Sequence, residues 1–160
     1  MLVKVFYFFV KAVNKIAGLP FSFSNDGEDF VLLKYLSKIE DGNYIDIGSH
    51  KPVRGSNTFL FYLLGWKGIC IDPLPNLKNK YRFIRSRDKF INAAVFGSNS
   101  LNQTDLNFYY YKNHTDNSTF DPERVKQLSD TFGREPSDVI PVPKINVAEI
   151  ISSNKNFFNE

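Results

Sequence analysis

The chain has 160 residues, of which 42% are hydrophobic and 16% aromatic. This composition predicts one compact folded domain and excludes a disordered chain. The formal net charge is only +3, which is too small to indicate a nucleic-acid-binding surface. We therefore expect no nucleic-acid partner.

Cysteine and histidine are too rare for most metal and disulfide chemistry. The single cysteine, Cys70, stands in an apolar run and is expected to be a small core residue. His50 and His114 are far apart in the sequence, so no metal site is predicted. A lone reduced cysteine fits a cytoplasmic protein.

One run of basic residues interrupts an otherwise even distribution of charge. We expect most of this run to form the solvent-exposed face of a helix and not a phosphate-binding site. Its members are Lys78, Lys80, Arg82, Arg85, Arg87 and Lys89.

The N-terminal residues 1–20 predict an amphipathic helix. Lys4, Lys11 and Lys15 interrupt an apolar stretch that is too short to span a bilayer and lacks a signal-peptide cleavage site. The lysines fall on one side at helical spacing, and Phe6 and Phe9 lie largely opposite. Such a helix suits peripheral contact with a membrane surface, and equally a partner or another part of the same chain.

Strands and helices then alternate. Asn25 and Glu28 resemble a capping box, residues 56–58 can cap a second helix, and Gly65 ends it. This alternation predicts βαβ units, a parallel sheet and an α/β fold. The expected elements are helix 29–39, strand 44–48, helix 56–64, strand 69–72, helix 77–85 and strand 90–96.

The second half continues the same domain, which we place at residues 21–160. A strand over 106–111, rich in tyrosine, has strong β propensity. A helix from Pro122 to about Asp130 follows, and then a strand over 139–145. The prolines in that last strand favour an edge position. A helix begins at Val147, and a polar tail ends the chain.

Acidic and polar residues stand at the ends of three predicted strands. Asp46 precedes a turn at Gly48, where glycine allows a ligand to approach the backbone closely. Asp72 closes the next strand, at the spacing of an acidic residue that binds ribose hydroxyls. Asn92 lies in the third strand, where an amide could read an adenine edge. The alternatives are structural: Asp46 caps a helix, Asp72 begins a turn before Pro73, and Asn92 is a satisfied amide.

Two carboxylates with few basic groups beside them indicate a cofactor without phosphates. S-adenosylmethionine fits, because it combines a sulfonium cation with a ribose, an adenine and an amino-acid end. A nicotinamide dinucleotide does not fit, because its pyrophosphate needs a Gly-x-Gly-x-x-Gly turn. After Gly48 no second glycine follows until Gly55.

A series of short motifs resembles the FkbM family of S-adenosylmethionine-dependent methyltransferases. It consists of residues 24–29 (SNDGED), 44–50 (YIDIGSH), 56–58 (SNT), 65–68 (GWKG) and 71–75 (IDPLP). The resemblance implies a Rossmann-like domain that transfers a methyl group to an oxygen, often a sugar or polyketide hydroxyl. It also implies that Asp46, Gly48 and Ser49 line the methionine end of the cofactor. Asp72 would hold the ribose, and Asn92 would lie near the adenine.

Residues 118–120 (STF) also resemble a family element facing the site, although they could equally form the N-cap before Pro122. The chain departs from the family at Asn25, where glutamine is usual, and it ends before the family's Asp-x-Glu-Gly strand. We therefore expect an incomplete sheet and self-association through an unpaired strand. The sequence identifies no residue as the catalytic base. The alternative to an enzyme acting on a small-molecule or glycan acceptor is a non-catalytic remnant or interaction module.

Overall fold

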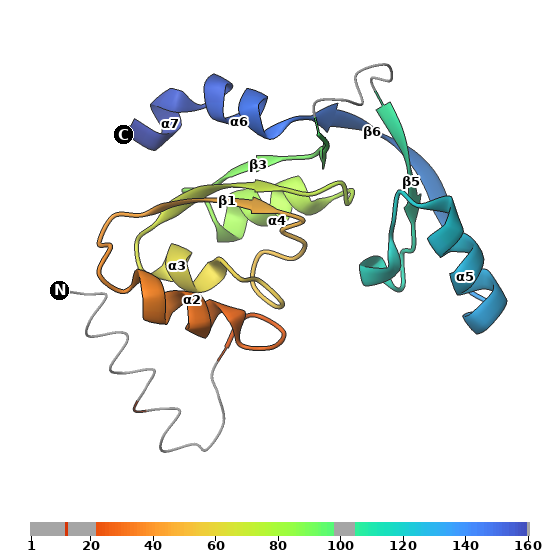
Figure 1. The fold of residues 1–160 in the computed structure, drawn as a ribbon, viewed down its shortest axis with the longest axis horizontal. Coiled ribbons are helices and arrows are strands. Elements are labelled where there is room, and N and C mark those ends of the chain that lie inside the picture. The colour runs from red at the N-terminus through yellow and green to blue at the C-terminus, as the bar shows by residue number, and fades with distance from the viewer. Residues whose placement is uncertain (1–11, 13–21, 98–104, 160) are drawn as a thin grey trace. The chain divides into compact units, whose positions relative to one another are not determined.

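Helices and strands alternate along the chain (Figure 1), which confirms the predicted α/β class. The computed structural model describes residue 12, residues 22–97 and residues 105–159, so the helix predicted over residues 1–20 lies, apart from residue 12, outside the described residues. The first elements are α2 (Glu28–Leu36), β1 (Asn43–Ile47), α3 (Phe59–Leu63), β2 (Lys67–Ile71), α4 (Leu77–Ile84) and β3 (Lys89–Ile91). They are followed by β4 (Ala94–Val95), β5 (Asp105–Tyr110), the 3-10 turn η1 (Thr115–Asn117), α5 (Pro122–Phe132), β6 (Asp138–Ile145), α6 (Val147–Ser153) and α7 (Lys155–Asn159).

The chain is divided into two compact units. One consists of the residues up to Cys70 together with Asn76–Ile91, and the other of Ile71–Pro75 and Asn92–Glu160. The first contains a three-stranded sheet in the order β1-β2-β3, and the second contains a three-stranded sheet in the order β4-β6-β5. The division at Cys70 falls inside β2.

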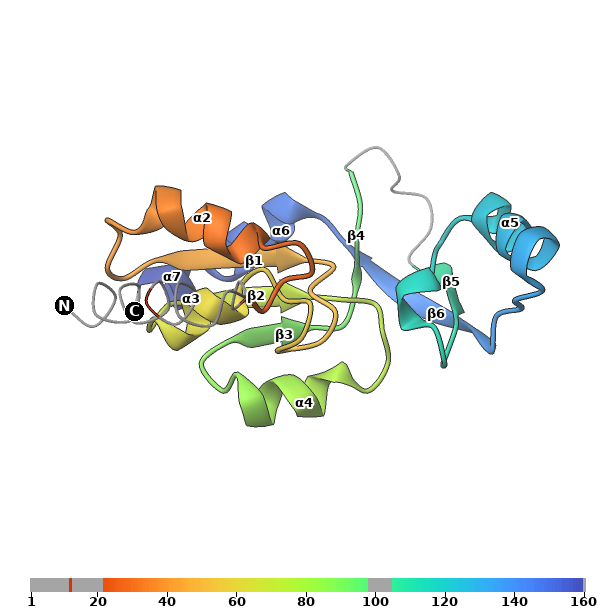
Figure 2. The ribbon, with the colours of Figure 1, turned by 90° about the horizontal axis from the view of Figure 1, so that it is seen from below.

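The first unit has the connectivity of βαβ units. Helix α3 lies in the connection from β1 to β2, and α4 lies in the connection from β2 to β3. Strands that follow one another along the chain are neighbours in the sheet, as short connections through a helix favour. Helix α4 contacts β3, and α2 contacts α3; Figure 2 shows α4 beside β3.

Aromatic and aliphatic side chains form the core of this unit. Leu33, Leu60, Phe61 and Trp66 are buried together, and the rings of Phe61 and Trp66 lie 4.9 Å apart between centroids. Gly68 in β2 lies against the Tyr44 ring from β1, and a β-carbon at residue 68 would overlap that ring. Packing in the core thus accounts for Trp66 and Gly68, two residues of the 65–68 motif.

The start of α2 differs from the predicted capping box. Its N-cap is Gly27, without a side-chain cap, and the Glu28 carboxylate accepts a hydrogen bond from Asp26 N at 3.0 Å. The buried Asp29 organises this segment instead, because its carboxylate accepts from Phe23 N at 2.9 Å and from Ser22 Oγ at 2.7 Å. The capping-box prediction was wrong because α2 begins one residue after Gly27, and the Asp29 carboxylate binds the preceding segment in place of a cap from Asn25.

The predicted third strand is not continuous. Residues 89–91 form β3 in the first sheet, whereas residues 94–95 form β4 in the second sheet. The break falls at Asn92 and Ala93. The side chain of Asn92 bonds to the turn after β2, so this residue serves a turn and not a sheet ladder.

Strand β6 is central in the second sheet, so the predicted edge position was wrong. It pairs antiparallel with β5, with Asp105 opposite Pro143 and Tyr110 opposite Asp138. It pairs parallel with β4 only at Lys144 and Ile145. Pro141 and Pro143 are two residues apart, so their missing N–H groups face one edge of the strand. The short β4 ladder begins beyond them.

Helix caps and aromatic packing complete the second unit. Asp121 caps α5 by accepting from Glu123 N at 2.9 Å, Pro122 begins the helix, and Gly133 ends it in the left-handed region. The Phe108 and Phe120 ring centroids are 4.8 Å apart. The residues after α6, predicted as a polar tail, include the short helix α7.

Candidate functional site

Three of the residues predicted to bind the cofactor lie at the carboxyl end of β1. Asp46 lies within the strand, Gly48 has a φ of 74°, and Ser49 is only 4% exposed. Gly48 lets the chain turn sharply without a steric penalty, and a β-carbon there would meet nothing within 4 Å. His50 is also left-handed, with a φ of 47°. Such backbone strain in a residue other than glycine tends to gather at functional sites.

Ser49 carries an orphaned polar atom. Its Oγ is buried and has no hydrogen-bond partner among the described residues, while its carbonyl accepts from Tyr81 Oη at 3.1 Å. Most buried hydroxyls are paired, and an unpaired one requires an explanation. A ligand group that bonds to this hydroxyl would satisfy it.

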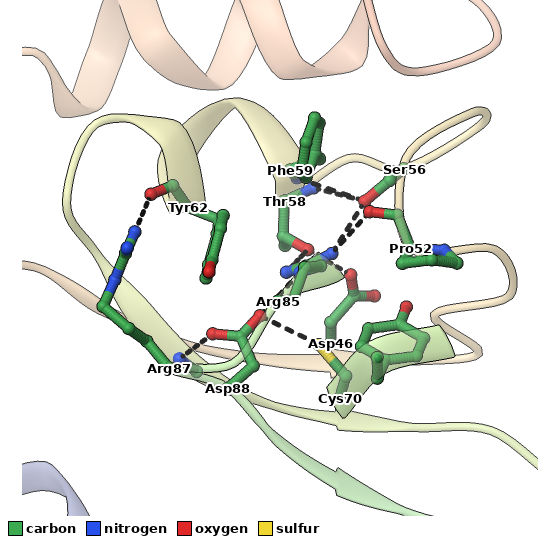
Figure 3. Close-up of polar contacts among 12 residues, drawn as sticks. Asp46, Pro52, Ser56, Thr58, Phe59, Tyr62, Cys70, Arg85, Arg87 and Asp88 are labelled. Atoms are coloured by element: carbon green, nitrogen blue, oxygen red, sulfur yellow. Dashed lines mark hydrogen bonds and ion pairs between the residues drawn. The ribbon is translucent and has the colours of Figure 1, made fainter. Parts of the chain in front are cut away.

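Asp46 is held by a neighbouring hydroxyl. Thr58 Oγ1 donates to Asp46 Oδ2 at 2.5 Å, and Arg85 Nη2 donates to the same Thr58 oxygen at 2.9 Å. These contacts connect β1, the residue before α3 and the end of α4. Figure 3 shows the three side chains converging.

Arg85 is the centre of this network, and its side chain is completely buried. Its Nε forms an ion pair with Asp88 Oδ2 at 2.6 Å, and both side chains are 0% exposed. Nη1 donates to Ser56 Oγ at 3.1 Å and to the Pro52 carbonyl at 3.4 Å, and Nη2 also donates to Tyr44 Oη at 2.8 Å. The guanidinium therefore ties α4 to the loop between β1 and α3.

Asp88 neutralises the guanidinium and is itself fully engaged. Gly68 N donates to Asp88 Oδ1 at 2.8 Å, and the Tyr44 hydroxyl lies 2.7 Å from Oδ2. A buried charge pair of this kind persists only when such additional bonds satisfy it. The pair stands among the rings of Tyr44, Tyr62 and Tyr81, each 5.3 to 5.6 Å from the guanidinium carbon.

Burial sets the protonation of the neutral neighbours. It raises the pKa of the Tyr44 hydroxyl and of the Cys70 thiol above their ordinary values, so both remain protonated at neutral pH. Burial by itself would lower the pKa of the Arg85 guanidinium, but the adjacent Asp88 carboxylate favours the charged form and raises that pKa. Cys70 is a buried core residue, as predicted.

The sequence did not single out the buried arginine. The basic run was expected on a solvent-exposed helix face, and Arg82, Arg87 and the three lysines are indeed exposed. Arg85 is the exception, because it stands at the C-cap of α4 and turns inward. The nearby Asp88 was the available signal, since an arginine and an aspartate three residues apart can pair.

Asp72 and Asn92 lie together at the turn after β2. Asp72 Oδ1 accepts from Leu74 N at 2.8 Å, which is the turn geometry that the structural alternative predicted. Asn92 Nδ2 donates to the carbonyls of Asp72 and Leu74, at 2.8 and 3.1 Å. Asn92 thus holds the turn that carries Asp72, in keeping with the satisfied-amide alternative, although the residue as a whole is exposed.

The remaining family motifs have structural partners. Phe23 O accepts from Gly55 N at 2.6 Å and from Ser56 N at 3.0 Å, so the segment around residues 22–25 holds the loop that follows β1. Ser118 Oγ accepts from Tyr111 N at 3.0 Å. The N-cap before Pro122 is Asp121, not Ser118 or Thr119.

Among the described residues, no group of three or more histidine, cysteine, aspartate or glutamate side chains could hold a metal ion. No helix in the described part of the chain is long and apolar enough to cross a bilayer.

Taken together, the fold and these strand ends define an α/β protein with acidic residues at the ends of consecutive strands. The sequence model of the Methyltransferase FkbM domain matches residues 46–159. Because this match covers most of the chain, the protein belongs to the FkbM methyltransferase family. Comparisons with curated proteins and with solved structures gave no match.

Proposed function

We propose that the residues at the end of β1 bind S-adenosylmethionine and that the protein methylates an oxygen of a small-molecule or glycan acceptor. The observation that carries the proposal is the buried Ser49 hydroxyl, which follows the Gly48 turn and has no hydrogen-bond partner in the part of the chain that the structure describes. Membership of a methyltransferase family supports the same cofactor class. We include in the proposal the Rossmann-like fold that membership of this family implies.

The donor set fits the chemistry of this cofactor. A carboxylate such as Asp46 accepts a hydrogen bond from an ammonium group, and the Ser49 hydroxyl can donate to a carboxylate. These are the two charged groups of the methionine end. Asp72 supplies a second carboxylate suited to ribose hydroxyls, and Asn92 fixes the turn from which Asp72 projects.

When bound, S-adenosylmethionine supplies an electrophilic methyl group on a sulfonium, which an acceptor oxygen attacks as the carbon–sulfur bond breaks. In this scheme the residues of the chain bind the two reactants and orient them. Holding two reactants in line provides much of the acceleration of such a transfer. The base that removes the acceptor proton is not assigned to any residue.

Calorimetric titration of the 160-residue chain with S-adenosylhomocysteine tests the proposal. We expect micromolar binding by the wild type, and a loss of about tenfold in affinity for Ser49→Ala and for Asp72→Ala, as for one hydrogen bond to a charged or polar ligand group. Ser49→Ala should not lower the unfolding midpoint, because the Ser49 hydroxyl makes no hydrogen bond to the described residues.

Asp121→Ala is a matched control, because it removes a carboxylate from a helix cap and should leave the affinity unchanged. No binding by folded wild-type protein would refute the proposal. Equal affinities for wild type and Ser49→Ala would remove Ser49 from the site. Once binding is established, methyl transfer from labelled cofactor to sugar and polyketide hydroxyls identifies the acceptor class.

A further inference from the structure

The hydroxyl of Thr58 has only one possible hydrogen-bond direction. A guanidinium can only donate, so Thr58 Oγ1 accepts from Arg85 Nη2 at 2.9 Å. An ionised carboxylate can only accept, so the Thr58 hydrogen points to Asp46 Oδ2 at 2.5 Å. The chain of bonds therefore runs from Arg85 through Thr58 to Asp46.

Arg85, the first donor in this series of hydrogen bonds, is held firmly in place. Arg85 is fully buried, and bonds to Asp88, Ser56 and the Pro52 carbonyl hold its remaining nitrogens. A guanidinium held in this way keeps a lone pair of Thr58 occupied. Because linked hydrogen bonds polarise one another, the charged donor also strengthens the bond from Thr58 to Asp46.

One oxygen of Asp46 is consequently anchored against the protein. The backbone of Asp46 is part of β1, so fixing Oδ2 also fixes the rotamer and the plane of the carboxylate. Groups that bind a cofactor must be held within a fraction of an ångström of their working geometry, and that precision comes from the side chains behind them.

We propose that Thr58, backed by Arg85, is a positioning residue that sets the orientation of the Asp46 carboxylate toward the cationic amino group of the cofactor. This inference rests on the proposed function for its ligand. The orientation of Asp46 itself is a property of the protein without ligand, so the two ideas can be tested separately.

Three variants isolate the bond from Thr58 to Asp46. Thr58→Val removes the hydroxyl with little change in shape, and Thr58→Ser retains it; Thr58→Ala carries the same prediction as the valine if valine does not fit. Ser24→Ala is the matched control. Ser24 is also a buried serine of the first unit, and its hydroxyl donates to Asp29 Oδ1 at 3.1 Å, at the start of α2 and away from Thr58 and Arg85.

Three measurements are made on each variant: the unfolding midpoint, the three-bond NMR couplings that report the χ1 rotamer of Asp46 without ligand, and the affinity for S-adenosylhomocysteine. In Thr58→Val we expect averaged Asp46 couplings and an affinity loss of about tenfold, as for a hydrogen bond to a charged group. Thr58→Ser should keep a single rotamer and stay within about twofold of the wild-type affinity. Ser24→Ala should lower the midpoint, because Asp29 loses a buried hydrogen bond, and should change neither the couplings nor the affinity.

An unchanged Asp46 rotamer in Thr58→Val would overturn the inference, and so would equal loosening in Ser24→Ala. If wild-type protein binds no S-adenosylhomocysteine while Thr58→Val still releases Asp46, the proposed function fails and the positioning role stands. If the wild type binds and Thr58→Val binds equally well, the positioning role fails and the proposed function stands.

Discussion

Replacing Arg85 by methionine should destabilise the first unit strongly. The substitution keeps much of the side-chain volume but removes the ion pair with Asp88 and the bonds to Ser56, Thr58, Tyr44 and the Pro52 carbonyl. It leaves the Asp88 carboxylate buried without its cation. Removing one member of a buried pair costs about 3–5 kcal/mol, which is a large share of the roughly 5–15 kcal/mol that stabilises a typical domain.

Arg87→Met is the matched control. Arg87 lies two residues further on and is exposed; it bonds to the Tyr62 carbonyl, and its guanidinium carbon stands 4.0 Å from the Tyr62 ring centroid. An exposed cation–π contact contributes about 0.5–1 kcal/mol, so we expect a loss of about 1 kcal/mol. Both arginines belong to the same basic run, and the two predictions differ because Arg85 is buried in an ion pair with Asp88 whereas Arg87 is exposed.

Urea unfolding followed by the fluorescence of Trp66 measures both variants. Trp66 is the only tryptophan in the chain, and it lies 5% exposed in the core of the first unit. Equal losses for Arg85→Met and Arg87→Met would refute the reasoning. An Arg85→Met, Asp88→Leu double variant should lose less than the sum of its single variants, because the unpaired charge is then absent.

Two further predictions follow from the same core. Gly68→Ala should cost about 1–3 kcal/mol in the Trp66 unfolding assay, because its β-carbon would overlap the Tyr44 ring; a cost near zero would mean that the ring moves aside freely. At alkaline pH, stability should fall as pH rises above about 10, the ordinary tyrosine value. Burial raises the folded pKa of Tyr44 and Tyr81, so above that pH the unfolded chain binds fewer protons than the folded chain. Tyrosinate absorbance should then rise together with Trp66 exposure, and independent ionisation of these two tyrosines in the folded protein would contradict their burial.

Local pattern in the sequence was enough to predict the α/β class and the approximate positions of most elements. Each element carried its own signal, such as the apolar run of β2 or Pro122 at the start of α5. The strand-end residues Asp46, Gly48, Ser49 and Asp72 could be selected in the same way, because βαβ connectivity places successive strand ends at one edge of a sheet. The family resemblance was visible in the same motifs.

The tertiary structure was needed to show which side chains and strands from distant parts of the sequence pair with one another. Arg85 reads as a surface residue in its basic run, yet Asp88, Ser56, Thr58 and Tyr44 surround it, and three of these partners lie far away along the chain. The central place of β6 and the break at Asn92 also depend on contacts between distant segments. Periodicity and capping rules describe neighbours in sequence, whereas burial and hydrogen-bond pairing are settled by which distant segments meet in the folded chain.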